Sequence, residues 1–379
     1  MPLTVVSVAY ALAPVRPGTA GGAEQVLAAL DRALVAAGHR SVVVAIEGSC
    51  AAGTLVPVPA PHGTLDNSVR AAQHRRMRVV LAQTLERLAR DGTPADVVHM
   101  HGLDFYDVLP PAGVPVLATL HLPPDWYPPD IWELRGPDGW RPRTYLHCVS
   151  DAQQRRCPDG AVVLPPIPNG VPVPPQPPRD RRRGYALCLG RVCPEKGYHL
   201  AATAAARAGV PLVVAGQLFP YAAHERYWAE ELAPRLGRGR ARFVGPVAGA
   251  AKARLLAGAR CLVVPSLAEE TSSLVAMEAA AAGTPVVAFR RGALPEVVVD
   301  GRTGWLCDDA DGLAAGIARA GLIHRRACWA EACARFDERV MSARYLARYA
   351  ELAAGRVASA TAVHAPRAEP PLAAARTAR

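Results

Sequence analysis

The chain has 379 residues, half of which are hydrophobic, and it carries a formal net charge of +10. This length allows two domains with sizeable cores, and the hydrophobic content excludes a disordered protein. No apolar run approaches the roughly 18 residues of a membrane-spanning helix. The first residues lack a charged leader, so they predict a strand rather than a signal peptide.

Arginine supplies nearly all of the positive charge, because Lys196 and Lys252 are the only lysines. A basic surface suits anionic partners such as nucleotides or phospholipid headgroups. The sequence contains no zinc-finger, RNP or recognition-helix pattern, so we expect no nucleic-acid partner. The nine cysteines are scattered and form no CxxC pair, which favours reduced thiols in a cytoplasmic protein over disulfides or a zinc site.

The first half of the chain alternates short apolar runs with helical stretches. We expect strands at Thr4–Ala9, Ser41–Ala45, Val97–His101, Val116–Leu120 and Leu146–Ser150. Helices are predicted over Ala23–Ala37 and Val69–Arg90. Continuous apolar strands separated by helices are typical of a parallel sheet that is covered on both faces.

A proline-rich stretch follows this first half of the chain. Prolines at this density interrupt both strands and helices, so residues 171–183 are predicted to be a semi-rigid linker. The alternation then resumes, with strands expected at Tyr185–Leu189, Leu212–Ala215, Arg242–Gly245, Cys261–Pro265 and Val286–Phe289. The sequence therefore predicts an α/β protein of two Rossmann-like doubly wound parallel-sheet domains, residues 1–170 and 184–335, that face a central cleft. A last helix is expected over 336–354 and a disordered tail over 355–379.

The segment EETSSLVAMEAAAAGTPVV at 269–287 places two glutamates in a largely apolar stretch. Thr271 or Ser272 is expected to cap a helix that follows a strand, and such a helix N-terminus favours a phosphate. Glu270 can then reach a sugar hydroxyl, and Glu278 can accept hydrogen bonds from a ribose diol. The alternative is that Glu278 pairs with a nearby arginine and Glu270 is a solvated loop residue.

A second candidate site lies in LCLGRVCPEKGYHL at 187–200. Arg191 and Lys196 follow the end of a predicted strand. Arginine offers a planar fork to phosphate oxygens and lysine a compact charge. The alternative is a pair of solvated surface cations.

These two segments resemble the retaining nucleotide-sugar glycosyltransferases of the GT-B fold, family 4, whose signature is two glutamates separated by seven residues. Further segments agree with the resemblance, which covers about residues 1–350: AGGAEQVLAAL, DVVHMHG, VLATLH, IPNGV and GALPEVVVDGRTGWL. The resemblance implies a hexosyltransferase that uses a nucleoside-diphosphate sugar, UDP-sugar being the most frequent donor in the family. It also implies that the last helix crosses back to the first domain and that no metal is required.

The resemblance also assigns expected roles to individual residues. On the phosphate side, Arg191 and Lys196 would neutralise the donor diphosphate, and backbone amides in the segment Ser272, Ser273 and Leu274 would meet the distal phosphate. Family members often have a Phe-Gly pair where Ser272 and Ser273 stand, which leaves the identity of the donor open.

On the sugar side, the resemblance implies that Glu270 contacts hydroxyls of the transferred sugar and that Glu278 holds the ribose. Gly21 and Gly22 would approach the phosphates from the first domain. His121 matches a histidine near the transferred sugar, the alternative being a strand-end histidine bonded to backbone. We interpret His99 and His101 as structural strand residues.

The acceptor is open: the candidates are a saccharide, a lipid-linked sugar and a small natural product. Trp126, Trp132 and Trp140 could stack on a sugar or cyclitol, or could pack their own loop. The basic helix at 69–90 could dock on anionic lipid at the inner face of the membrane, or could be a solvated face.

Other functions remain as alternatives. The chain could be a non-catalytic sugar-nucleotide sensor on the same fold, or an epimerase or phosphorylase of similar architecture. A dinucleotide-dependent oxidoreductase would use Glu47 as its ribose-binding acid, but PGTAGG at 17–22 is not GxGxxG and its loop is too long.

Overall fold

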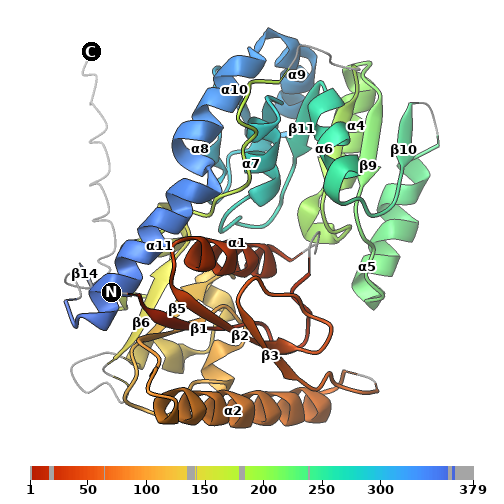
Figure 1. Ribbon diagram of the computed structural model, residues 1–379. Helices are drawn as coiled ribbons and strands as arrows, with labels where there is room; N and C mark the ends of the chain where they lie inside the picture. The colour runs from red at the N-terminus through yellow and green to blue at the C-terminus, as the bar shows by residue number, and fades with distance from the viewer. Residues whose placement is uncertain are drawn as a thin grey trace, which may run out of the picture.

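The computed structural model describes residues 2–16, 21–63, 65–134, 141, 143–178, 184–237 and 240–356, and the backbone of 361–362. Two α/β units lie one above the other, and the long C-terminal helix α11 (Glu338–Ala353) runs from the upper unit across to the lower one (Figure 1). The predicted crossing helix is therefore confirmed. Most of the predicted tail lies outside the described residues.

The lower unit is built on a sheet from the N-terminal half of the chain. Its parallel strands, in sheet order, are β7 (Val162–Leu164), β6 (Thr144–Cys148), β5 (Val116–Leu120), β4 (Val97–Met100), β1 (Thr4–Val8), β2 (Arg40–Ile46) and β3 (Thr54–Val58). A short antiparallel strand, β14 (Thr361–Ala362), extends this sheet beside β7. Helix α1 (Gly22–Ala36) packs with α11 against the face that holds Val5, and α2 (Asn67–Arg90) packs against the face that holds Val6.

The upper unit has a second parallel sheet. Its strands, in sheet order, are β10 (Ala241–Phe243), β9 (Leu212–Ala215), β8 (Ala186–Leu189), β11 (Cys261–Val264), β12 (Val286–Phe289) and β13 (Gly304–Cys307). The helices around it are α4 (Tyr198–Arg207), α5 (Ala222–Tyr227), α6 (Gly249–Gly258), α7 (Leu274–Ala281), α8 (Leu294–Val297), α9 (Ala310–Arg319) and α10 (Arg325–Glu331). The strand order reverses between β8 and β11, which is where open α/β sheets bind ligands.

The predicted doubly wound architecture is confirmed, and every predicted strand has a counterpart whose ends differ by at most two residues. The sequence prediction missed β3, β7 and β13, and also β14, which lies in the segment predicted to be a disordered tail. β3 is a partly exposed edge strand that contains Pro57, a residue confined to such positions, so its apolar pattern is weak. β7 has only three residues and runs directly into two prolines.

Helix α11 is joined to the lower sheet by buried polar contacts. His99 on β4 hydrogen-bonds the Tyr349 hydroxyl through Nδ1 (2.6 Å) and the Thr119 hydroxyl through Nε2 (2.7 Å). Burial holds the pKa of His99 well below its usual value, so the ring is neutral. The interpretation of His99 as a structural strand residue is confirmed. His101 is also buried, directly after the end of this strand.

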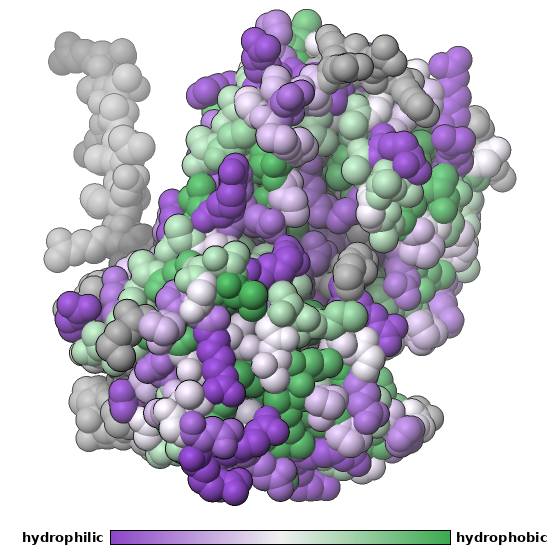
Figure 2. All heavy atoms as spheres, in the orientation of Figure 1, coloured by the Kyte–Doolittle hydropathy of each residue, from purple (hydrophilic) through white to green (hydrophobic). Residues whose placement is uncertain are grey.

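The basic helix α2 forms the lower edge of the molecule (Figure 1). It begins at the N-cap Asp66, whose carboxylate accepts a hydrogen bond from the Val69 N–H, and it buries Met77 and Leu81 against the core. Figure 2 shows hydrophilic side chains gathered on the surface along this edge. Among the described residues, no helix combines the length and the apolar character that crossing a bilayer requires.

Candidate active site

A pocket of about 340 Å³ lies between the two units, within the volume range of small-molecule sites. It is formed at the carboxyl ends of parallel strands. His121 follows β5, Gly190 follows β8 and Gly216 follows β9, and all three line the pocket. Most of the predicted site residues also line it: Gly22, Trp126, Arg191, Lys196, Glu270, Ser272, Ser273, Leu274 and Glu278.

Each of the two signature glutamates pairs with one of the two lysines of the chain. Lys196 Nζ lies 2.6 Å from Glu270 Oε1, and Lys252 Nζ lies 2.6 Å from Glu278 Oε1. The glutamate side chains are only 11% and 12% exposed, so an unpaired carboxylate would be costly at either position. The expected alternative partner of Glu278 was an arginine; the observed partner is Lys252, which sequence reasoning had not placed in the site.

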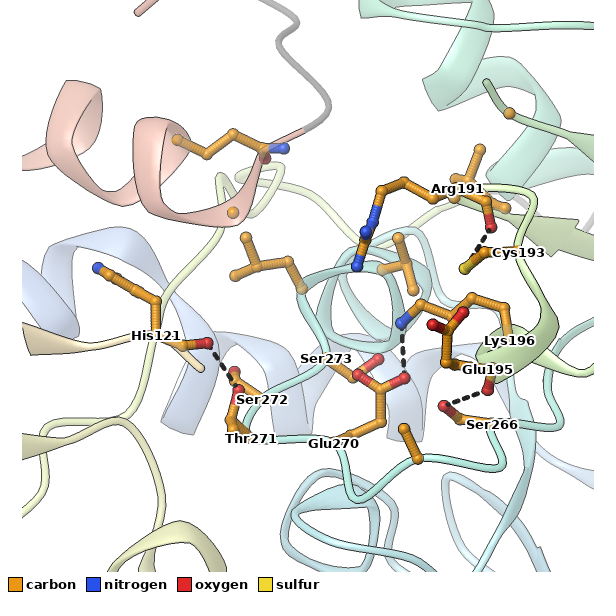
Figure 3. A pocket seen from close by; sticks show the side chains of 18 of the residues that line it. His121, Arg191, Cys193, Glu195, Lys196, Ser266, Glu270, Thr271, Ser272 and Ser273 are labelled. Carbon is orange, nitrogen blue, oxygen red and sulfur yellow. Dashed lines mark hydrogen bonds and ion pairs between the residues drawn. The ribbon is translucent and has the colours of Figure 1, made fainter. Parts of the chain in front are cut away.

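Arg191 supplies a third positive charge. Its side chain is exposed and points into the pocket beside Lys196 (Figure 3). It forms no ion pair with any carboxylate in the described part of the chain. The Arg191 guanidinium is therefore the cation of this pocket that is most available to an anionic ligand.

Two helix N-termini meet at the pocket. α7 begins at Leu274 and α1 begins at Gly22, and a Cβ built on Gly22 would lie 3.4 Å from Leu274 Cδ1. Helix N-termini present unpaired N–H groups and the positive end of the helix dipole. The pocket thus offers converging backbone donors to a phosphate from both units.

The predicted cap of α7 is wrong. The N-cap residue is Ser273 rather than Thr271 or Ser272, and its hydroxyl makes no capping hydrogen bond within the described chain. Thr271 instead donates its hydroxyl to the backbone carbonyl of His121, 3.1 Å away in the other unit (Figure 3). The hydroxyl that was expected to stabilise a helix therefore links the two walls of the pocket.

Two glycines next to the pocket have steric reasons to be glycine, although neither is among the residues that line it, and Gly21 is thus the predicted glycine that the pocket lining lacks. At Gly21, a Cβ would lie 1.7 Å from the carboxylate of Glu24, which folds back over the start of α1. At Gly292, φ is +54° and a Cβ would lie 2.3 Å from the Glu270 carbonyl oxygen. That carbonyl accepts a hydrogen bond from the Ala293 N–H (2.7 Å), so the turn after β12 holds the Glu270 loop in place.

His121 lies on the opposite wall from the lysines. Burial lowers the pKa of its imidazole to about 4, so the ring is neutral at pH 7. Its Nε2 is buried and has no hydrogen-bond partner among the described residues. Its backbone N–H donates to the Tyr127 hydroxyl (3.0 Å), which fixes the turn after β5.

The three candidate tryptophans have different positions. Trp126 is 59% exposed and lines the pocket. Trp132 packs against the core of the lower unit and is not among the residues that line the pocket, which favours the packing alternative for this residue. Trp140 lies outside the described residues.

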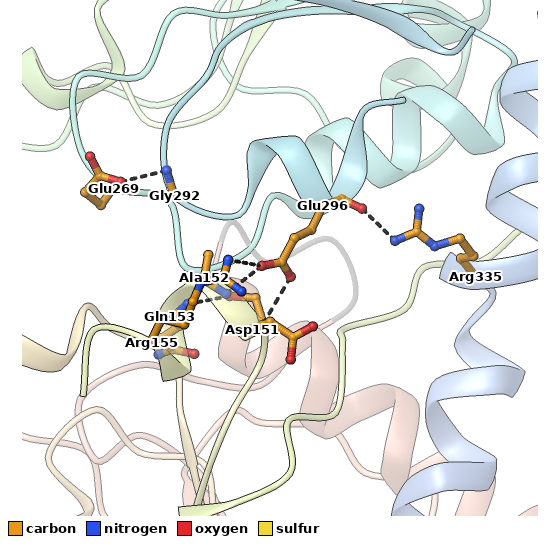
Figure 4. A network of polar contacts seen from close by, with 9 residues as sticks. Asp151, Ala152, Gln153, Arg155, Glu269, Gly292, Glu296 and Arg335 are labelled. Carbon is orange, nitrogen blue, oxygen red and sulfur yellow. Dashed lines mark hydrogen bonds and ion pairs between the residues drawn. The ribbon is translucent and has the colours of Figure 1, made fainter. Parts of the chain in front are cut away.

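Sequence reasoning also missed a contact between the two units. Glu296 on α8 accepts hydrogen bonds from the backbone N–H groups of Asp151 (3.1 Å) and Ala152 (2.5 Å), at the start of α3 (Asp151–Gln154) in the other unit (Figure 4). The Arg335 guanidinium donates to the Glu296 carbonyl (2.7 Å). Nothing in the local sequence signals this contact, because its partners are about 145 residues apart.

Comparisons with known proteins agree with this geometry. The family described as Glycosyltransferase Family 4 matches residues 20–173, and the one described as Glycosyl transferases group 1 matches residues 183–321. The glycogen synthase of Mycobacterium tuberculosis strain H37Rv is 30% identical over 361 residues, which span 79% of this chain and 82% of that enzyme.

Two further relatives are informative. The phosphatidyl-myo-inositol mannosyltransferase of Mycolicibacterium smegmatis is 38% identical over 121 residues, but the match spans only 29% of this chain and 31% of that protein. The solved structure of AviGT4, a glycosyltransferase involved in avilamycin A biosynthesis, superposes with a TM-score of 0.69 at 25% identity and covers 93% of this chain and 99% of that one.

Proposed function

The chain belongs to glycosyltransferase family 4, with the GT-B fold, and from that premise we propose that it transfers a hexose or aminohexose from a nucleoside-diphosphate sugar with retention of configuration. One observation carries the proposal. Arg191, Lys196 and the N-terminus of α7 converge in one pocket, with Glu270 and Glu278 beside them. This arrangement suits a diphosphate flanked by two sugars.

The proposed chemistry is electrostatic. When the bond between the sugar and the diphosphate breaks, negative charge develops on the distal phosphate, and preorganised cations and N–H groups stabilise that charge. We assign this role to Arg191, Lys196 and the backbone amides of Ser272, Ser273 and Leu274, and the start of α1 at Gly21 and Gly22 would add its dipole. The positive groups of the pocket supply this stabilisation without a metal.

Glu270 would then exchange its partner when the donor binds. In the structure Lys196 is bonded to Glu270, so a diphosphate that attracts Lys196 releases the Glu270 carboxylate to accept hydrogen bonds from sugar hydroxyls. Glu278 would hold the ribose while Lys252 keeps its charge balanced. The acceptor hydroxyl would attack from the leaving-group side, with a phosphate oxygen taking its proton and neutral His121 facing the sugar.

UDP-sugar is the donor that we propose, with GDP- and ADP-sugars as alternatives. For the acceptor, the match to a phosphatidyl-myo-inositol mannosyltransferase supports a lipid-linked molecule, and the likeness to AviGT4 supports a small natural product. A saccharide is the third candidate, supported by the match to glycogen synthase. We further propose a cytoplasmic enzyme whose helix α2 contacts anionic lipid if the acceptor is lipid-linked.

A thermal-shift screen across nucleoside diphosphates and their sugars tests the donor. A ligand at about 100 times its dissociation constant should stabilise the protein by about 2.7 kcal/mol. We expect the stabilisation by the preferred nucleotide to fall in Lys196→Ala and in Glu278→Ala. Donor hydrolysis or transfer should accompany binding. Binding without any turnover across a panel of acceptors would instead support a sensor, and the absence of any nucleotide-dependent shift would contradict the proposal.

A further inference from the structure

A cluster of three different metal-ligating side chains lies in the wall of the pocket. Cys193 and Glu195 come from the turn after β8, at and within the short 3₁₀ helix η4 (Pro194–Lys196), and His224 comes from α5. One Sγ, one carboxylate oxygen and one imidazole nitrogen from these residues lie within 4.8 Å of one another. Cys193 and Glu195 line the pocket next to Arg191 (Figure 3).

The histidine of this cluster lacks a partner that a buried imidazole ordinarily has. His224 is only 8% exposed, and its Nδ1 is buried without a hydrogen-bond partner among the described residues. The Tyr221 ring packs edge-on against the His224 ring, with 5.1 Å between the ring centroids. This ring contact is not a hydrogen bond to Nδ1. Because Nδ1 has no partner among the described residues, it remains available to a ligand such as a metal ion or a water molecule.

The other two ligands are held in place by backbone contacts. The carbonyl oxygen of Glu195 accepts hydrogen bonds from the Leu267 N–H (2.7 Å) and the Ser266 hydroxyl (3.3 Å), which tie η4 to the loop after β11. The Cys193 thiol is 1% exposed and lies against the carbonyl of Arg191 (3.8 Å). The Cys193 and His224 side chains are therefore buried in the wall, and the Glu195 side chain is exposed at its surface.

We propose that Cys193, Glu195 and His224 form a binding site for Zn²⁺ in the wall of the pocket. Sulfur, nitrogen and oxygen ligands together select zinc over magnesium or calcium, and three protein ligands leave a fourth tetrahedral position for water or a substrate oxygen. The thiolate and the carboxylate balance the two positive charges of the ion. The loaded site is therefore neutral.

Cobalt titration of the full-length, reduced and metal-stripped protein tests the site. Co²⁺ substitutes for zinc, and a thiolate ligand produces a near-ultraviolet charge-transfer band that Zn²⁺ should abolish on addition. We expect one equivalent of Co²⁺ to saturate this band in the unchanged protein. The matched control is Cys307→Ser, because Cys307 is also a buried thiol near carboxylates but is not part of the cluster.

Cys193→Ser should lose the band, and the affinity for Zn²⁺ should fall by at least about 100-fold, since even residues behind a metal ligand are worth about 10- to 100-fold. His224→Gln and Glu195→Gln should each weaken Zn²⁺ binding while keeping the thiolate. Thermal unfolding of each variant shows whether it is folded. If Cys193→Ser does not fold, the affinity of Glu195→Gln for Zn²⁺ tests the site instead. No charge-transfer band in the unchanged protein, or equal zinc affinity in Cys193→Ser and Cys307→Ser, would overturn the proposal.

This test is independent of the transferase proposal, because the metal alone is the probe and no sugar nucleotide is present. Repeating the nucleotide screen with zinc-loaded protein then asks whether the fourth position contacts the diphosphate. The cobalt titration alone therefore decides whether the metal site exists.

Discussion

The two walls of the pocket differ in charge. The wall from the upper unit carries Arg191, both lysines and both signature glutamates, whereas the wall from the lower unit is lined by Gly22, Gln25, His121, Leu122, Pro123 and Trp126. None of these six described residues is charged, since His121 is held neutral by burial. A charged wall suits a ligand with fixed negative charge, and a neutral wall suits a hydroxylated one. We infer that donor recognition depends on electrostatics and acceptor recognition on shape and hydrogen bonding.

The largest expected effect is on the charged wall. Lys196→Ala should lower kcat by about 10²- to 10³-fold, because it removes one preorganised group that stabilises the leaving diphosphate. Steady-state rates at saturating donor measure this loss.

Lys252→Ala is the matched control, since Lys252 is equally half-buried and also pairs with a glutamate at 2.6 Å. The loss of kcat in Lys252→Ala should be much smaller, because we place Lys252 beside the ribose rather than the diphosphate. Equal losses in the two variants would show that the effect comes from an unpaired glutamate and not from a missing phosphate contact.

Glu278→Gln should act on donor binding rather than on the chemical step. A hydrogen bond to a charged group is worth about 1.5–3 kcal/mol, so we expect the donor KM to rise by about 10- to 100-fold with a smaller change in kcat. Initial rates over a range of donor concentrations, with calorimetric binding of the free nucleoside diphosphate, separate the two parameters. An unchanged donor KM would remove Glu278 from the ribose site.

The neutral wall is tested by comparing two tryptophans. Trp126→Ala should raise the acceptor KM by several-fold and leave thermal stability unchanged, since Trp126 is 59% exposed in the pocket. Trp132→Ala should instead destabilise the fold by about 1–3 kcal/mol and have no specific effect on acceptor affinity. This cost is smaller than that of replacing a fully buried tryptophan, because Trp132 is only partly buried. Denaturant unfolding and acceptor kinetics of both variants measure the difference, and a reversal of the two patterns would contradict it.

The last comparison concerns pH. Burial depresses the pKa of His121 from 6.5 to about 4. The unfolded chain therefore binds a proton between these values that the folded protein does not, and stability should be complete above about pH 6.5 and fall as pH drops toward 4. The slope of unfolding free energy against pH should decrease in His121→Gln. A slope in His121→Gln equal to that of the unchanged protein would contradict this prediction.

The same contrast explains what could be predicted from the sequence. The strands are continuous apolar runs, so their positions were evident, and the charged residues of the upper wall stand within short segments at strand ends. β3 and β7 were missed because proline and brevity hide their patterns. The start of α7 was misplaced because Thr271, Ser272 and Ser273 are all possible caps, and the choice depended on a contact from Thr271 to the carbonyl of His121.

The sequence by itself determined the alternation of strands and helices and the placement of Arg191 and Lys196 at the end of a strand, because these are properties of local pattern and spacing. Only the tertiary structure decided that Lys252 is the partner of Glu278, that Glu296 binds the start of α3 and that His224 meets Cys193 and Glu195. These contacts join elements that are distant along the chain. Which side chains meet across such distances is set by how two sheets pack and face each other, and no local spacing encodes that packing.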